Sequence, residues 1–132
     1  MKRFLVAILF LAALVLPASA SDRVLIHKGE TVYVQFEMKG KKIKLTGFTK
    51  EKNDAAQVIF TLGPDPKKAG LQSLKVENKL PRDLTYKLEM RSLTLRMKMN
   101  VPTSPVVAGK VAYEPFPPQA EELALDDFAL VK

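Results

Sequence analysis

The chain has 132 residues, no cysteine and a single histidine, His27. Without cysteine, its own side chains cannot form a disulfide, a zinc–thiolate centre or an iron–sulfur centre, or supply a thiol nucleophile. A catalytic triad needs a histidine or another base beside a nucleophile, and no Gly-x-Ser-x-Gly sequence surrounds any serine. Phosphate loops, dinucleotide fingerprints, His-Glu-x-x-His motifs and calcium loops are also missing. The sequence therefore predicts a protein that is not an enzyme and holds no cofactor.

The part of the chain after residue 20 also lacks a helical repeat of useful length. Instead, apolar and polar residues alternate in short runs that turn residues separate, as in a sheet with one buried face. This predicts an all-β fold of seven or eight strands in two antiparallel sheets, a sandwich, with a small closed β-barrel as the alternative. The runs cover residues 24–27, 32–38, 43–48, 58–62, 71–80, 84–99, 106–113 and 120–131, the last of which also suits a helical turn.

The first twenty residues predict export. A basic Met1-Lys2-Arg3 precedes thirteen apolar residues, Phe4 to Leu16, and small residues follow at Pro17-Ala18-Ser19-Ala20. This is typical of a signal peptide cleaved after Ala20, because a membrane span needs about twenty apolar residues. Removing residues 1–20 leaves one domain of 112 residues, Ser21 to Lys132, with no further membrane span. We expect a periplasmic or secreted protein.

The stretch from Leu71 to Met99 contains a change of register. Leu84 to Met90 places apolar residues at even positions, whereas Leu93 to Met99 places them at odd positions. A strand can change its buried face only through a bulge or a bend, so we expect a break at Arg91-Ser92. The same change makes Met97 and Met99 the continuation of an apolar stripe, which predicts that they pack in the core.

Four segments carry a resemblance to a group of proteins. They are Asn78–Pro81, Leu84–Tyr86, Pro105–Phe116 and Leu125–Leu130. Together they resemble small exported bacterial proteins of unassigned function with immunoglobulin-like sandwiches. The resemblance implies an immunoglobulin-like fold and carries no functional residue with it.

Met97 and Met99 also raise the possibility of a metal site. The Met-x-Met spacing puts two thioethers on one side of a strand, and soft sulfur ligands select Cu(I). Exported β-sandwich copper carriers use such methionines with histidine, and this chain is similar to them in size, compartment and that motif. A periplasmic copper carrier using Met97, Met99 and His27 is therefore the alternative function, against core packing of both methionines.

Charge supplies the leading functional hypothesis. The net charge is +7, or +5 once Lys2 and Arg3 are removed with the signal peptide. This favours a non-catalytic binding protein that engages an anionic glycan, a lipid or an acidic envelope protein. The alternative role of the lysines is solubility and protection of a sheet edge against self-association. The predicted basic face consists of Lys39, Lys41, Lys42, Lys44, Lys50 and Lys52.

Two further classes receive less support. Nucleic acid is not an expected partner, because export removes the chain from it and aromatic residues do not alternate with the basic ones. A carboxylate hydrolase would need two acids that converge in a cleft. Neighbours in a strand point to opposite faces, so Glu121-Glu122 and Asp126-Asp127 are expected to lie apart.

Overall fold

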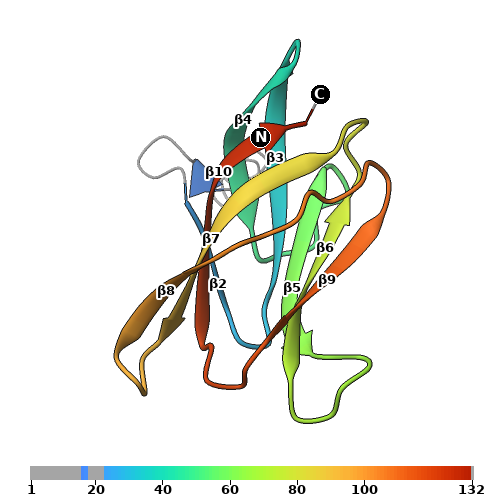
Figure 1. Cartoon of the computed structure of the whole chain (residues 1–132). Coiled ribbons are helices and arrows are strands. Elements are labelled where there is room, and N and C mark those ends of the chain that lie inside the picture. The colour runs from blue at the N-terminus through green and yellow to red at the C-terminus, as the bar shows by residue number, and fades with distance from the viewer. Residues whose placement is uncertain (1–15, 18–22, 132) are drawn as a thin grey trace, which may run out of the picture.

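The computed structural model describes residues 16–17 and 23–131 (Figure 1), and within them it contains strands and no helix. The prediction of an all-β protein is confirmed. The strands are β1 (Leu16–Pro17), β2 (Val24–His27), β3 (Thr31–Lys39), β4 (Lys42–Thr49), β5 (Val58–Pro64), β6 (Gln72–Asn78), β7 (Leu84–Ser92), β8 (Met97–Val101), β9 (Val111–Phe116) and β10 (Glu122–Leu130).

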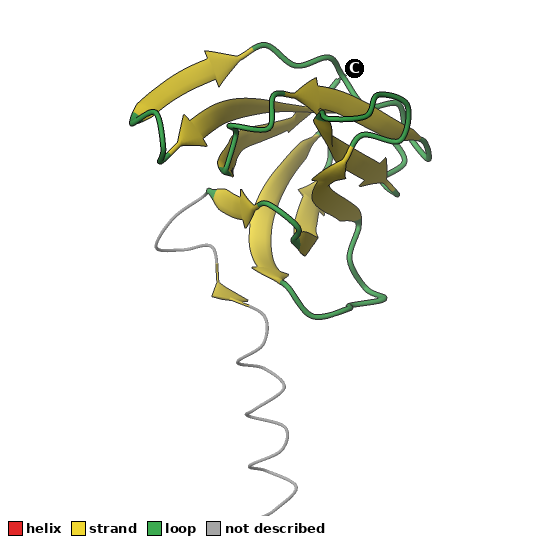
Figure 2. Cartoon of the chain, turned by 90° about the horizontal axis from the view of Figure 1, so that it is seen from below, coloured by secondary structure: helices red, strands yellow, loops and turns green. Residues whose placement is uncertain are grey.

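The strands form two antiparallel sheets, which Figure 2 shows as two layers joined by loops. One sheet has the order β4-β3-β5-β6-β9, with the two-residue β1 added at its β4 edge. The other has the order β2-β10-β7-β8. The described residues thus form an open two-sheet sandwich and not a closed barrel. Nine strands follow residue 23, more than the predicted seven or eight, because residues 84–99 form two strands.

The core lies between the two sheets and follows the alternation of the sequence. In β3, Val32, Val34 and Phe36 are buried while their neighbours are more exposed. In β10, Leu123 and Leu125 are fully buried. An aromatic cluster joins the layers, since the ring of Phe60 in β5 lies 5.7 Å from Tyr86 in β7 and 6.1 Å from Phe128 in β10, centroid to centroid.

The β3–β4 hairpin projects beyond the rest of its sheet. β3 pairs with β5 only from Thr31 to Val34, whereas its pairing with β4 continues to Lys39 opposite Lys42. Gly40 has a φ of 64° at the turn, a conformation that glycine adopts without strain. The hairpin therefore holds its tip away from the centre of the molecule, as Figure 1 shows at the top.

The chain changes sheets at several points, one of them between β6 and β7, and does not do so at the predicted break. β6 belongs to the five-strand sheet and β7 to the four-strand sheet, so residues 79–83 cross between the layers. Asn78, only 1 % exposed, stabilises this crossing. Its side chain donates to the carbonyls of Arg82 and Val106 and accepts from the backbone N–H of Leu80.

The break at Arg91-Ser92 is confirmed, but it is the end of a strand and the start of a hairpin. β7 ends at Ser92, and β8 returns beside it in the same sheet with Met97 opposite Ser92 and Met99 opposite Met90. The expectation of a bulge or of a bend into another sheet is wrong. Arg96, with a φ of 50°, adopts the left-handed conformation that reverses the chain.

The prediction that Met97 and Met99 pack in the core is also wrong. Their side chains are 44 % and 48 % exposed, and Leu93 and Leu95 in the turn are 68 % and 56 % exposed. The register does place both methionines on the face that buries Leu88 further along β7. Since they remain exposed, the opposite sheet does not cover the end of this hairpin.

The last two strands correct one prediction and confirm another. The strand predicted at residues 106–113 is β9, Val111–Phe116, and Val106 makes only an isolated bridge to Leu84. The final segment is a strand and not a helical turn. Its register shifts between Asp126 and Ala129, and Asp127 has a φ of 52°, which confirms the irregularity expected at Asp126-Asp127.

β1 falls within the segment predicted to be cleaved. Leu16 and Pro17 pair with Phe48 and Gly47 at the edge of β4. The predicted cleavage point after Ala20 lies outside the described residues. Removal of residues 1–20 would leave β4 as the edge strand of a five-stranded sheet.

Candidate functional site

The six lysines predicted to form one basic face lie at two separate places. Lys39, Lys41, Lys42 and Lys44 are exposed at the tip of the β3–β4 hairpin. Lys50 and Lys52 lie beyond the opposite end of β4, and Lys50 is six residues after Lys44, the last lysine of the tip. At about 3.3 Å per residue, β4 separates the nearest members of the two groups by about 20 Å. The hairpin tip therefore carries four lysines and not six.

The two groups also differ in their contacts. Lys50 donates to the carboxylate of Glu30 at 2.7 Å, which places it in a network described below. At the tip, Lys39 lies 3.9 Å from Glu37, a long and exposed ion pair that contributes little stability. Met38, 36 % exposed, lies opposite Ile43, which packs against the core. By alternation Lys39, Lys42 and Lys44 point to the other face, so the lysines and the apolar side chains of the tip lie on opposite faces.

His27 does not lie with the two methionines. It is opposite Glu122 in β10, which is opposite Arg91 in β7, and Arg91 is opposite Lys98 in β8. His27 therefore shares a face with Lys98, whereas Met97 and Met99 point to the other face of the same sheet. The ligand set of Met97, Met99 and His27 is not brought together by this fold.

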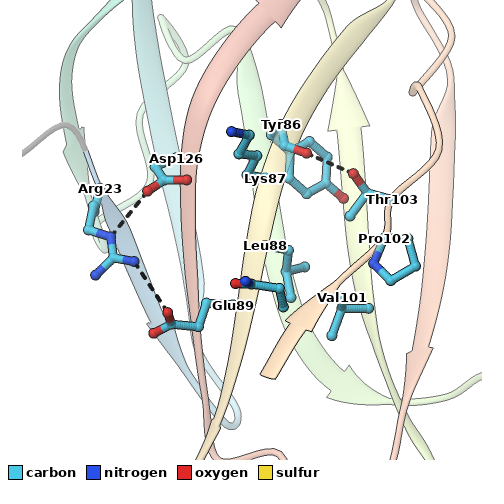
Figure 3. Close-up of a pocket in the computed structure, with 10 residues that line it drawn as sticks. Arg23, Tyr86, Lys87, Leu88, Glu89, Val101, Pro102, Thr103 and Asp126 are labelled. Carbon is cyan, nitrogen blue, oxygen red and sulfur yellow. Dashed lines mark hydrogen bonds and ion pairs between the residues drawn. The ribbon is translucent and has the colours of Figure 1, made fainter. Parts of the chain in front are cut away.

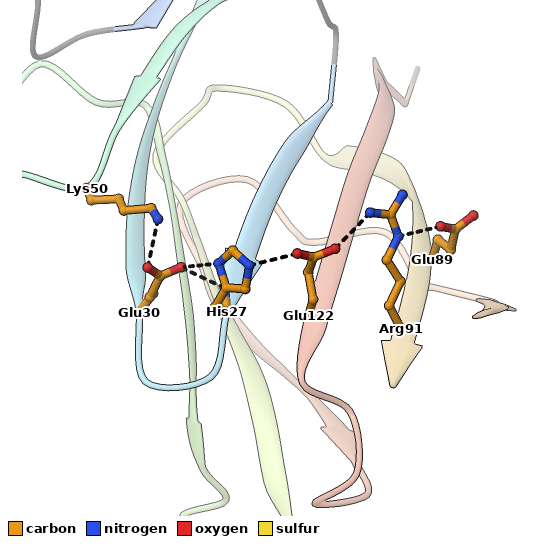
Figure 4. A network of polar contacts seen from close by, with 6 residues as sticks. All are labelled: His27, Glu30, Lys50, Glu89, Arg91 and Glu122. Carbon is orange, nitrogen blue, oxygen red and sulfur yellow. Dashed lines mark hydrogen bonds and ion pairs between the residues drawn. The ribbon is translucent and has the colours of Figure 1, made fainter. Parts of the chain in front are cut away.

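The imidazole of His27 instead lies between two carboxylates (Figure 4). Its Nδ1 is 3.0 Å from Glu30 Oε1, and its Nε2 is 2.7 Å from Glu122 Oε2. Glu30 also accepts from the backbone N–H of His27 and from Lys50. Among the described residues, no group of three His, Cys, Asp or Glu side chains is arranged to hold a metal ion.

The polar network continues across the outer face of the four-stranded sheet, the face turned away from the core. Arg91 donates to Glu122 and to Glu89 at 2.7 Å each. The hydrogen bond from Arg91 holds the pKa of Glu89 below its usual value, and the same carboxylates raise the pKa of Arg91. Partial burial would raise the pKa of Glu30, but hydrogen bonds from Lys50 and His27 hold it below its usual value.

These lowered pKa values predict a loss of stability in acid. A glutamate with a lower pKa in the folded state stabilises the fold fully above its unfolded pKa of about 4.3, and this contribution is lost as the pH falls further. We expect Glu30→Gln to lower the melting temperature at pH 6 and to have a smaller effect at pH 3. Thermal melts at both values check this, with Glu51→Gln, at an exposed loop position, as the control. An equal effect of Glu30→Gln at both pH values would contradict the assignment.

A pocket of about 550 Å³ lies over the outer face of β7 and β8 (Figure 3). Arg23 crosses one side of it and contacts the carboxylates of Asp126 at 3.2 Å and Glu89 at 3.7 Å. On the other side, the hydroxyl of Thr103 donates to the backbone carbonyl of Tyr86. Its lining carries both signs of charge, in ion pairs, and so gives no preference for an anion or a cation.

The acidic pairs weighed for hydrolysis are separated by their contacts. Glu121 accepts from the side chain and the backbone of Thr94, and these hydrogen bonds lower its pKa. Glu122 lies between His27 and Arg91. Asp126 pairs with Arg23, and Asp127 lies 3.3 Å from Lys87. Each of the four carboxylates therefore contacts different partners.

Comparisons with protein-family models, with curated proteins and with solved structures found no match to this chain. Among the described residues, no helix is both long and apolar enough to cross a membrane. The resemblance to immunoglobulin-like exported proteins, the signal peptide and the compartment stay predictions from the sequence. The geometry of the side chains is the remaining guide to function.

Proposed function

We propose that this chain is an exported, non-catalytic binding protein of the bacterial cell envelope, and that the tip of the β3–β4 hairpin docks on an anionic, phosphate-bearing surface. The observation that carries the proposal is the presence of four exposed lysines within six residues of a projecting hairpin. Export follows from the predicted signal peptide at residues 1–20. Lipopolysaccharide, teichoic acid and acidic glycans supply such a surface in the envelope.

The shape of the hairpin favours contact with a surface. Because β3 leaves β5 after Val34, the tip can approach a flat partner before the rest of the sandwich meets it. Lys39, Lys42 and Lys44 share one face of the hairpin, so they can reach the phosphates of a partner together. Each lysine near an anionic membrane contributes about 1 kcal/mol. Electrostatic attraction decays over about 8 Å at physiological salt, so lysines about 20 Å away along β4 add little.

Two pairs of substitutions test this proposal with the same change in net charge. We expect Lys41→Ser with Lys42→Ser to weaken binding to lipopolysaccharide-containing vesicles by roughly 30-fold, the equivalent of about 2 kcal/mol. Lys50→Ser with Lys52→Ser, at the far end of β4, is expected to change binding less than about threefold. Vesicle co-sedimentation at low and at moderate salt measures both, with phosphatidylcholine vesicles as the uncharged reference.

The outcomes separate the possible partners. Equal losses for the two pairs would show that net charge and not the hairpin tip determines binding, and would overturn the proposal. Binding that does not respond to salt would do the same. Binding to soluble acidic glycan but not to vesicles would assign the tip to a carbohydrate polymer instead of a lipid surface.

A further inference from the structure

Three methionines share one face of the β7–β8 hairpin. Met99 in β8 lies directly opposite Met90 in β7, and Met97 is two residues before Met99 in the same strand. Since side chains two residues apart in a strand point to the same side, all three thioethers lie on the inner face of the sheet, the face turned toward the core. Met90 is not among the ligands predicted from the sequence, because its position is nine residues before Met99.

This face is open to solvent at the end of the hairpin. Met97 and Met99 are 44 % and 48 % exposed, whereas Met90 is partly buried against the core. A methionine that fills a core gap would be buried on all sides. Packing therefore accounts for the buried part of the Met90 side chain. It does not account for the exposed side chains of Met97 and Met99.

The spacing allows the three sulfur atoms to meet. Opposite residues in an antiparallel pair have Cβ atoms about 4.5–5.5 Å apart, and diagonal neighbours are about 7–8 Å apart. Methionine has three rotatable bonds, so three such side chains can converge on one point above the sheet. We propose that Met90, Met97 and Met99 form a Cu(I) site in which three thioethers hold the ion.

The chemistry of the ligands defines the ion. Thioethers are soft and neutral, and they favour Cu(I) over Zn²⁺ and over the harder Cu²⁺. Histidine and cysteine must lose a proton to bind a metal, but a thioether has none to lose. Binding is therefore expected to be independent of pH between about 5 and 8, whereas a site that included His27 would weaken in acid.

The site is separate from the surface proposed to bind anions. The β7–β8 hairpin lies at the opposite end of the molecule from the tip of the β3–β4 hairpin (Figure 1). It therefore goes beyond the proposed function, and either proposal can fail without the other. Together they would describe an envelope protein that carries copper at one end and docks at the other.

Titration of the predicted mature protein, residues 21–132, with Cu(I) under anaerobic conditions tests the site. A chromophoric chelator that competes for the ion gives affinity and stoichiometry, and Ag(I) serves as an analogue that does not change oxidation state. In protein labelled at the methionine methyl groups, we expect one equivalent to shift the NMR signals of Met90, Met97 and Met99. Met38, on the other hairpin and 36 % exposed, is the internal control and should not shift.

Conservative variants then assign the ligands. Met90→Leu, Met97→Leu and Met99→Leu are each expected to lower the affinity at least tenfold, because leucine keeps the volume and removes the sulfur. Met38→Leu and His27→Gln should leave the affinity unchanged. Equal shifts at Met38, or an affinity that the three variants do not alter, would overturn the site.

The exposed apolar side chains of the β7–β8 hairpin could instead pair with a second copy of the chain. If no Cu(I) binds and sedimentation shows dimers that Met97→Lys dissociates, the hairpin is an edge for self-association, and the metal site is refuted. If no Cu(I) binds and the protein stays monomeric at all concentrations, the metal site is refuted as well.

Discussion

Replacing Phe60 by alanine is expected to lower the free energy of unfolding by about 3–5 kcal/mol. Phe60 is fully buried in β5, and its ring meets Tyr86 edge-on and lies against Phe128. These two partners come from the opposite sheet, so the substitution opens a cavity between the layers. Small domains are stable by only about 5–15 kcal/mol, and this one contains no cysteine to form a disulfide. The variant should therefore be close to the limit of folding.

Urea denaturation followed by tyrosine fluorescence or circular dichroism measures the effect. Tyr113→Ala is the control, because it removes an aromatic ring that is 49 % exposed on β9. We expect this control to cost less than about 1 kcal/mol. Similar losses for Phe60→Ala and Tyr113→Ala would show that the cluster of Phe60, Tyr86 and Phe128 is not the centre of the core.

Alternation of apolar residues predicted the strands well wherever both sheets cover them. Val32, Val34 and Phe36 alternate with polar residues, and the structure buries all three. The final segment was ambiguous between strand and helix because Asp126-Asp127 interrupts its pattern. The structure resolves this with a bulge, which lets Phe128 return to the core side after the interruption.

Alternation could not predict how far each sheet extends. Met97 and Met99 have the parity of a core stripe, but burial also requires an opposite sheet at that point. The sequence of the preceding turn does not predict a chain reversal, since Leu93 to Arg96 contains no glycine, proline or asparagine. Arg96 adopts a positive φ that the sequence pattern would assign to glycine. Alternation alone therefore predicts one strand with a bulge or a bend at this point, and not a hairpin.

The candidate site depends on register in the same way. Lys42 and Lys50 are close in sequence, yet the extended conformation of β4 separates them. Met90 and Met99 are opposite each other only because the strand turns back between them. His27, Glu122 and Arg91 meet across three strands, and a contact of this kind follows from strand order, which the sequence left open.

The second prediction with a large expected effect on stability concerns Asn78. This residue is polar, but it occupies a position at which the alternation of β6 favours an apolar side chain. Leu74 and Val76 precede it on the buried face, and Asn78 itself is 1 % exposed. Its amide nitrogen donates to the carbonyls of Arg82 at 3.0 Å and Val106 at 2.9 Å. Its oxygen accepts from the N–H of Leu80 at 2.9 Å. One amide thus stabilises both the crossing between the sheets and the segment that bridges to β7.

Asn78→Ala is expected to lower the free energy of unfolding by about 2–4 kcal/mol, because it leaves the buried N–H of Leu80 and the carbonyl of Arg82 without their partner and removes one of the two donors to the carbonyl of Val106. Asn78→Asp should cost more at pH 7, since a buried carboxylate would face the carbonyls of Arg82 and Val106. Urea denaturation measures both. Asn53→Ala is the matched control: its side chain accepts one hydrogen bond, from the N–H of Ala55 in an exposed turn, and should cost about 1 kcal/mol or less. If Asn78→Ala cost no more than Asn53→Ala, the backbone alone would be sufficient to hold the crossing between β6 and β7.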